Sequence, residues 1–264
     1  MIHDFMITER FGIVPDLPLE MDPPGACKHK RFLFHLNKQG RCRYGVFPRT
    51  AKDSSEIIWV ETESHYVFHF ANSWDDNENG TDFVVFYAVV WPDLDLSWEQ
   101  KESFDIVGNQ VFEKFVINLE TKVIERTVVI DFNTRMEFPM FALDQTGYRS
   151  RYCYLATKEP GLQVQDKFCQ QFDCLVKVDL ETDTIVQKTV PNATQTFGEV
   201  YFQPRDARQA EDDGYLMTTI YDSNLEKSFF VMWDAKSFAV VAKVQLEQRV
   251  PYGFHSTFVR REDY

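Results

Sequence analysis

The sequence predicts an all-β chain built from the repeated hairpins of a β-propeller. Short apolar runs separated by polar turns recur along its 264 residues, whereas helical periodicity is scarce. Three stretches share one form, in which a β-run is followed by Asn or Asp, a short polar turn and a second β-run: FVINLETKVIERTVV (115–129), LVKVDLETDTIVQKTV (175–190) and FVMWDAKSFAVVAKVQL (230–246). Their turn residues Asn118, Asp179 and Asp234 are 61 and 55 residues apart. This interval is slightly longer than the ~40–50 residues of a usual blade, and a β-sandwich, the alternative, does not explain three copies of one hairpin.

Candidate strands follow one another along the whole chain. The first is Ile2–Thr8, and a loop rich in proline (9–25) comes after it. The later predicted strands are Arg31–Leu36, Arg43–Phe47, Glu56–Glu61, Tyr66–Phe70, Asp82–Val90, Phe112–Asn118, Val123–Ile130, Tyr152–Thr157, Leu175–Asp179, Ile185–Val190, Glu199–Gln203, Tyr215–Tyr221, Ser228–Trp233 and Ala239–Leu246. One short helix is predicted over Asp95–Val107. Because no linker rich in Pro, Gly or Ser interrupts the chain, we expect residues 1–264 to form a single domain.

The composition of the chain argues against several classes of function. The chain is 44% hydrophobic and 15% aromatic, enough for a large buried core. Its net charge of −13, without a Lys/Arg cluster, argues against binding to nucleic acid and to anionic membranes. The five cysteines are odd in number and include no CxxC pair, so we expect reduced and mostly buried thiols: Cys27, Cys42, Cys153, Cys169 and Cys174.

The chain begins directly on a strand-like segment. No signal or transit segment precedes IHDFMIT, and we expect an intracellular protein of the cytoplasm or a plastid. A domain rarely begins within a strand that carries a candidate ligand. We therefore expect the natural start to lie upstream.

Three histidines stand in matched settings. An apolar run in YVFHFANSWDD delivers His69 to the point where polar residues begin, and His3 and His255 lie in similar short apolar segments. Any one of them alone is best explained as a hydrogen-bonded core residue. Together they favour a shared metal, and imidazole nitrogen suits iron, zinc, copper and nickel. No thiolate accompanies them, which weighs against structural zinc. The other histidines have basic or polar neighbours and are interpreted as surface residues: His29, His35 and His65.

Two carboxylates lie in apolar segments. Glu137 stands in RMEFPMF and Glu199 in TFGEVYF. A buried glutamate must be paired, and a metal-bound histidine usually donates its other N–H to a fixed acceptor. We therefore predict that Glu137 reaches the imidazole of His69 and that Glu199 reaches that of His255. The alternative, an edge-strand glutamate facing water, is the better explanation for Glu199 taken alone.

These segments together resemble a known family. The carotenoid cleavage oxygenases carry similar motifs in the same order: HDFMITE, FHFANSWDD, EFP, GEVYFQPR followed by AEDDGYL, and RVPYGFHSTFV. The plant-type members are the most similar, in IVPDLPLEMDP, in RYGVFPR and in the spacing from His3 to His69. The resemblance implies a seven-bladed propeller that holds non-haem Fe(II) on its axis with four histidines, of which this chain matches roughly the C-terminal four to five blades.

The family motifs assign roles to individual residues of this chain. Three of the four iron-binding histidines map to His3, His69 and His255, and the fourth lies upstream of the HDF motif. The glutamates that hold ligating imidazoles map to Glu137 and Glu199. Apolar residues beside the iron map to Phe68, Phe138 and Phe254. Four positions depart from the usual family residue: Ser73, Asp75, Met140 and Ser256.

The resemblance implies oxidative cleavage of one conjugated C=C bond of a carotenoid or apocarotenoid by O2, which gives two carbonyl products. A neutral, apolar polyene suits an aromatic-lined tunnel, and phenylalanine faces stabilise positive character on it. For weak peripheral contact with a membrane, the chain offers Ile13–Met21, which is also explained as a surface loop. The alternative function is a truncated, non-catalytic propeller remnant that binds lipid or a partner. Exposed strand edges of an incomplete propeller would favour aggregation.

Overall fold

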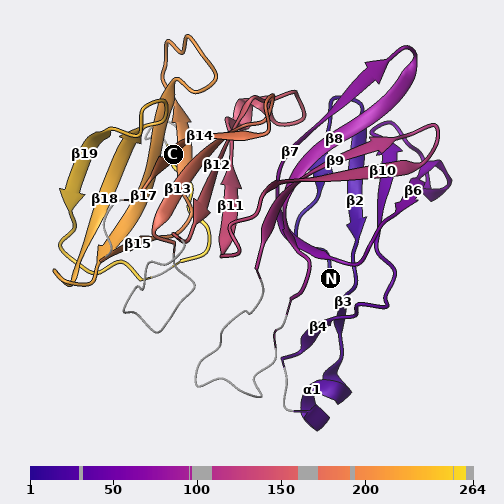
Figure 1. Ribbon diagram of the computed structural model, residues 1–264, viewed down its shortest axis with the longest axis horizontal. Helices are drawn as coiled ribbons and strands as arrows, with labels where there is room; N and C mark the ends of the chain where they lie inside the picture. Colours follow the sequence, from indigo (N-terminus) through magenta and orange to yellow (C-terminus); the bar gives the residue numbers. More distant parts are fainter. Residues whose placement is uncertain are drawn as a thin grey trace. The chain divides into compact units, whose positions relative to one another are not determined.

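The computed structural model describes residues 1–29, 32–94, 96, 109–159, 172–190, 194–251 and 253–259 (Figure 1). The chain divides into two compact units, each treated by itself below. Unit 1 comprises Met1–Asn133 and Gln145–Arg149, and unit 2 comprises Thr134–Asp144 and Ser150–Tyr264. The single domain expected from the sequence stays a prediction.

Unit 1 contains two four-stranded antiparallel sheets. The first has the order β1-β2-β5-β6, from Met6–Ile7, Phe11–Asp16, Arg43–Pro48 and Ile58–Glu61. The second has the order β10-β9-β8-β7, from Val123–Ile130, Val111–Asn118, Thr81–Trp91 and Tyr66–Glu78. A two-stranded ribbon, β3 (Leu19–Met21) with β4 (Phe34–Leu36), a short helix α1 (Pro23–His29) and the 3₁₀ turn Ser54–Glu56 complete the described part of the unit.

The core of unit 1 lies between its two sheets. Alternate residues of β8 face this core, among them Val84, Phe86 and Ala88, all fully buried. Tyr44 from β5 packs edge-on or tilted against Phe86 and Phe115, with ring centroids 5.0 and 5.8 Å apart. Aromatic side chains therefore supply much of the apolar area that holds the sheets together.

Unit 2 also contains two sheets. The first has the order β11-β12-β13-β14, from Met136–Met140, Tyr152–Thr157, Cys174–Asp179 and Thr184–Thr189. The second has the order β15-β17-β18-β19, from Gln195–Phe197, Gly214–Asp222, Lys227–Asp234 and Val240–Gln245, and β16 (Tyr201–Pro204) also pairs with β17. A 3₁₀ turn spans Leu143–Gln145. Sheets of four strands that follow one another in sequence are the blade unit of propellers.

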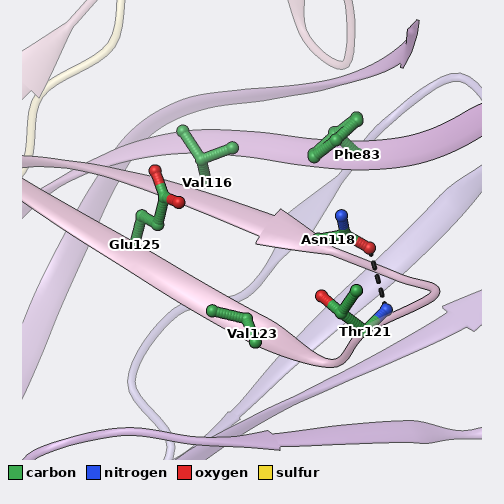
Figure 2. Close-up of a pocket in the computed structure, with 6 residues that line it drawn as sticks. All are labelled: Phe83, Val116, Asn118, Thr121, Val123 and Glu125. Atoms are coloured by element: carbon green, nitrogen blue, oxygen red, sulfur yellow. Dashed lines mark hydrogen bonds between the residues drawn. The ribbon is translucent and has the colours of Figure 1, made fainter. Parts of the chain in front are cut away.

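The three hairpins predicted from the repeat are confirmed as β9–β10, β13–β14 and β18–β19. In each turn the Asn or Asp oxygen accepts backbone N–H groups two or three residues on; for Asn118 these belong to Glu120 and Thr121, at 3.0 and 2.9 Å (Figure 2). The residue four positions later has a positive φ, as Lys122 does at 58°. Local side-chain chemistry thus fixes each turn.

A pocket of about 230 Å³ lies beside the first of these hairpins, and Figure 2 shows the residues that line it. Its lining comes from β8, β9, the turn and β10: Phe83, Val116, Asn118, Thr121, Val123 and Glu125. None of the predicted site residues lines it.

Several expected boundaries are wrong. The first strand is only Met6–Ile7, and the predicted proline loop 9–25 contains β2, β3 and part of α1. Pro15 is tolerated within β2 because the short β1 pairs only with Gly12 and Ile13, so no neighbour on that side needs its missing N–H. Besides β2 and β3, two further strands were missed, β11 and β15. The predicted helix Asp95–Val107 lies almost wholly outside the described residues.

The segment Ile13–Met21 does not offer an apolar surface to a membrane. Ile13, Leu17 and Leu19 are buried in the core of unit 1, and Met21 alone of its large apolar residues is exposed. In the described part of the chain, no helix has both the length and the apolar character needed to cross a membrane. Cys42, Cys153 and Cys174 are buried free thiols, as expected, whereas Cys27 is exposed; Cys169 lies outside the described residues.

Candidate metal centre and substrate site

The first strands of three blades are interrupted at predicted functional residues. Strand β7 does not end at Phe70, as predicted, but continues through the polar residues to Glu78. Between the pairs Val67↔Val90 and Phe70↔Ala88 it contains one residue more than its partner β8, and this bulge includes His69. A bulge leaves backbone groups unpaired and turns side chains out of the regular alternation.

Strand pairing is interrupted in the same way at two places in unit 2. In β11 the register shifts between Glu137 and Met140, which brackets Phe138. Between β15 and β16, opposite the continuous β17, the gap from Phe197 to Tyr201 includes Glu199. Thr218 of β17 donates its hydroxyl to the Glu199 carbonyl at 2.7 Å, so a backbone group released by the interruption is satisfied by a side chain.

In unit 1 the structure brings His3 and His69 together. Their ring centroids are 4.9 Å apart and nearly perpendicular. His3 Nδ1 lies 3.0 Å from the Phe68 carbonyl oxygen, which can only accept, so this nitrogen carries the proton. The lone pair of His3 is therefore on Nε2, the nitrogen through which this tautomer would bind a metal.

Phe68 lies beside this pair. Its ring contacts that of His3 edge-on at 5.3 Å, and it also packs against Tyr66 and Trp91 at 4.8 and 5.7 Å. The aromatic side chain is thus held by other rings next to the candidate ligands. This position agrees with the substrate-contact role that the family motif assigns to it.

Two of the departures from the family motifs have visible partners. The Ser73 hydroxyl donates to the Ile7 carbonyl at 2.8 Å, a bond that alanine would not make. Asp75 accepts from the main-chain N–H and the guanidinium of Arg10, at 3.1 and 2.6 Å. Burial alone would raise the pKa of Asp75, but hydrogen bonds from Thr8 and Arg10 hold it below its usual value. Both residues tie the turn between β1 and β2 to β7.

In unit 2 the predicted contact between Glu199 and His255 is present. Glu199 Oε1 lies 3.3 Å from His255 Nδ1, and Oε2 accepts the backbone N–H of Ser256 at 2.7 Å. One carboxylate therefore holds both the ring and the backbone next to it. The Glu199 side chain is only 13% exposed, so the alternative of a glutamate facing water is wrong.

Phe138 also reaches His255. Its ring packs edge-on against the imidazole with centroids 5.6 Å apart, and its backbone has a positive φ of 53°. Such a conformation is uncommon for a bulky residue and costs about 1–3 kcal/mol where the surroundings impose it. Phe254, in contrast, is 71% exposed.

Glu137 is buried, and its Oε2 accepts the backbone N–H of Phe138 at 3.0 Å. It belongs to unit 2 and His69 to unit 1. The predicted contact of Glu137 with His69, and the convergence of His255 with His3 and His69, therefore stay predictions.

His65 is not the surface residue that its polar neighbours suggested. It is fully buried, donates from Nδ1 to the Glu63 carbonyl at 2.8 Å and accepts at Nε2 from the Tyr44 hydroxyl at 2.8 Å. Burial, reinforced by the nearby Arg126 cation, lowers the pKa of His65 to about 3. The ring is a neutral structural element. Of the other two, His29 is exposed as expected, and His35 is partly buried.

The residues of unit 1 fit a divalent metal only as part of a larger ligand set. Among the described residues, no group of three or more His, Cys, Asp and Glu side chains is arranged to hold a metal ion. The His3–His69 pair supplies two neutral imidazoles, one with its tautomer fixed. A pair of this kind is chemically suited to Fe(II), which accepts imidazole ligands.

Comparison with known proteins identifies the family. Residues 1–260 match the family described as RPE65, retinal pigment epithelial membrane protein. The chain belongs to this family, that of the carotenoid cleavage oxygenases. A carotenoid 9,10(9',10')-cleavage dioxygenase 1 from Pisum sativum is 33% identical over 99% of this chain and 49% of its own length. A chromoplastic zeaxanthin 7,8(7',8')-cleavage dioxygenase from Crocus sativus is 30% identical over 98% of this chain and 68% of its own length.

Solved structures show the same fold. Cobalt-substituted Synechocystis ACO superposes with a TM-score of 0.80 at 23% identity, over 98% of this chain and 53% of that one. The carotenoid oxygenase propeller predicted from the sequence is thereby confirmed. The chain spans about half the length of most of the curated relatives it matches.

Proposed function

We propose that this chain forms part of a non-haem Fe(II) oxygenase that cleaves a conjugated C=C bond of a carotenoid or apocarotenoid with O2. His3, His69 and His255 are its candidate ligands, and the products are two carbonyl compounds. The observation that carries the proposal is the His3–His69 pair at a bulge of β7, in which His3 Nδ1 donates to the Phe68 carbonyl and the ring lone pair is therefore on Nε2.

When bound, the iron supplies open positions at which O2 is activated. The chain's own residues prepare the site. Phe68 and Phe138 present apolar rings next to candidate ligands, where they position an apolar substrate and limit access of water. Glu199 accepts a hydrogen bond from His255 Nδ1–H and so directs the other ring nitrogen towards a metal. We propose the corresponding role for Glu137 at His69.

Metal binding tests the ligand assignment. We expect the chain, prepared without oxygen, to bind Fe(II) or Co(II), and His3→Ala and His69→Ala each to weaken binding by about 10-fold or more. His29→Ala is the matched control, because His29 is exposed and lies at the end of α1. Equal affinities for the wild type and both ligand variants would contradict the assignment.

We expect the 264 residues alone to turn over little or no substrate. Cleavage of one chosen double bond needs a polyene held in one register, and relatives named as dioxygenases are about twice as long as this chain. The protein is reconstituted with Fe(II), then given O2 and a detergent-solubilised apocarotenoid, and aldehyde products are followed by chromatography. Clear iron-dependent turnover by the monomer would show that this chain is sufficient.

The second candidate is a non-catalytic module that binds a partner or a lipid. Exposed apolar side chains beside the candidate ligands favour it: in unit 1 Ile2 and Phe5 are 58% and 63% exposed, and in unit 2 Phe254 is 71% exposed. Faces of this kind are usually covered in a complete assembly. Metal binding that depends on His3 and His69 would favour the oxygenase over this alternative.

A further inference from the structure

Asp4 accepts a hydrogen bond from a backbone N–H of β7, the edge strand of its sheet, next to the bulge. Its Oδ2 accepts the N–H of Phe70 at 3.1 Å, while His3 donates to the carbonyl of Phe68 at 3.0 Å. These two backbone groups flank His69 in the chain. The dipeptide His3–Asp4 therefore holds the bulge on both sides of the second candidate ligand.

The carboxylate of Asp4 is itself fixed. Its Oδ1 accepts the N–H of Phe5 at 2.8 Å, so the two oxygens join the first segment of the chain to β7. Residues 1–5 belong to no strand in the structure. His3 is held without a sheet ladder: on one side of it Met1 donates to the Leu19 carbonyl at 2.5 Å and accepts from the Tyr66 hydroxyl at 3.4 Å, and on the other side Asp4 binds the Phe70 N–H.

We propose that Asp4 is a positioning residue for the His3–His69 pair. By binding the N–H of Phe70, it keeps the segment of His3 against the bulge, so that His3 Nδ1–H stays on the Phe68 carbonyl and the lone pair stays on Nε2. The geometric part stands on the hydrogen bonds alone. Its meaning for metal binding rests on the proposed function.

Other hydrogen bonds between the start of the chain and β7 allow the role of Asp4 to be tested by substitution. Farther along the chain, Ser73 binds the Ile7 carbonyl and Asp75 binds Arg10. These bonds keep β1 and the turn after it on β7 when Asp4 is replaced. Asp4→Ala should therefore fold and loosen the attachment of His3 to β7, while the bonds of Met1 to Leu19 and Tyr66 keep the start of the chain in place. Asp4→Asn keeps one acceptor oxygen and should retain part of the effect.

The first readout needs no metal. In the full chain, Asp4→Ala should speed hydrogen exchange at the Phe70 amide about five- to tenfold. Nitrogen-15 spectra of the His3 ring should show a mixture of tautomers in place of the Nδ1–H form. Asp53→Ala is the matched control, since Asp53 also accepts a nearby N–H, that of Ser55, at the 3₁₀ turn of unit 1. Unchanged exchange at Phe70 and an unchanged His3 tautomer in Asp4→Ala would overturn the proposal.

The second readout is Co(II) binding by calorimetry, with melting temperature measured alongside. Asp4→Ala should weaken the affinity about tenfold, Asp4→Asn less, and Asp53→Ala not at all. If the wild type binds Co(II) and Asp4→Ala binds it equally well, Asp4 does not position the pair and the proposal is wrong. If the wild type binds no Co(II), the proposed function fails, and Asp4 is judged by the exchange and tautomer data alone.

Discussion

In unit 1 the rings of His3 and His65 donate their Nδ1–H to main-chain carbonyls, whereas in unit 2 His255 donates to the carboxylate of Glu199. Both kinds of acceptor fix the tautomer. Only the carboxylate adds a negative charge, which strengthens the ring as a metal ligand. The carbonyl orients the ring without adding a charge. The two units therefore present imidazoles of similar geometry in different electrostatic settings.

The largest expected effect concerns the buried ring of His65, which donates to a main-chain carbonyl and which we expect to stay neutral as the pH falls. The pKa of His65 is depressed to about 3 in the folded chain, against an unfolded value of 6.5. Its contribution to stability is complete above pH 6.5 and is lost as the pH falls, by about 1.4 kcal/mol per pH unit. Urea unfolding of the wild type at pH 6.5, 5.5 and 4.5 should show this slope.

The variant His65→Asn should remove that slope, because asparagine offers a donor near the Nδ1 position and does not titrate. The exposed residue His29, replaced in the same way, is the control and should leave the slope unchanged. Carboxylates with lowered pKa values, such as those of Asp82 and Asp222, lose their contribution only below about pH 4. Asp173, whose pKa is raised by burial, acts in the opposite direction as the pH falls, so the difference in slope between the wild type and His65→Asn isolates His65. A wild-type slope in His65→Asn would contradict this prediction.

The second effect concerns the carboxylate-bound ring of unit 2, that of His255. Glu199→Gln should weaken metal retention about 10–100-fold in a chain that binds metal, because the amide neither carries the charge nor accepts at both atoms. Glu247, exposed in the same unit, gives the control Glu247→Gln. The measurement is metal content after dialysis against a weak chelator. Retention equal to the wild type would show that the Glu199–His255 contact does not serve a metal.

The hairpins could be predicted from the sequence because the hydrogen bonds that form their turns are local. Asn118, Asp179 and Asp234 each bind backbone groups within three residues, and the predicted β10 and β12 match the structure at both ends. His65 was misjudged for the opposite reason. Its polar neighbours in the chain suggested a surface, but its partner Tyr44 lies 21 residues away and in another blade.

The bulges explain why the candidate site was found only in part. A register shift depends on how two strands pack, so YVFHFANSWDD alone does not reveal that β7 continues past His69 with an extra residue. Glu199 was identified from its apolar neighbours and from the family resemblance. Asp4 was overlooked although it is adjacent to His3, because a single carboxylate next to a ligand indicates no role until the fold shows that it accepts the N–H of Phe70.

A smaller effect compares the hairpin turns of the two units. Asp234 accepts two backbone N–H groups and the Ser237 hydroxyl, and it pairs with Arg205 at 2.6 Å. Burial alone would raise its pKa, but hydrogen bonds from Ser237 and Arg205 lower it to about 2. Asp234→Ala should cost about 2–3 kcal/mol. Asn118→Ala, which loses only two neutral bonds, should cost about 1 kcal/mol. Equal losses in urea unfolding would contradict the difference between the turns.

The smallest effect concerns the residue that closes the same turns. Lys122 has a φ of 58°, a conformation in which an ordinary side chain is strained and glycine is not. Lys122→Gly should therefore stabilise the chain by up to about 1 kcal/mol, because relief of this strain exceeds the added flexibility of the unfolded chain. Lys122→Ala separates the backbone effect from loss of the lysine charge and should leave stability nearly unchanged.

Phe238 holds the same position in the β18–β19 turn with a φ of 59°, but its side chain is buried in the core of unit 2. Phe238→Gly should relieve the same strain and still destabilise, by about 2 kcal/mol or more, because the packing lost outweighs it. Urea unfolding checks all three variants, and a loss of stability in Lys122→Gly would show that the turn does not strain its closing residue.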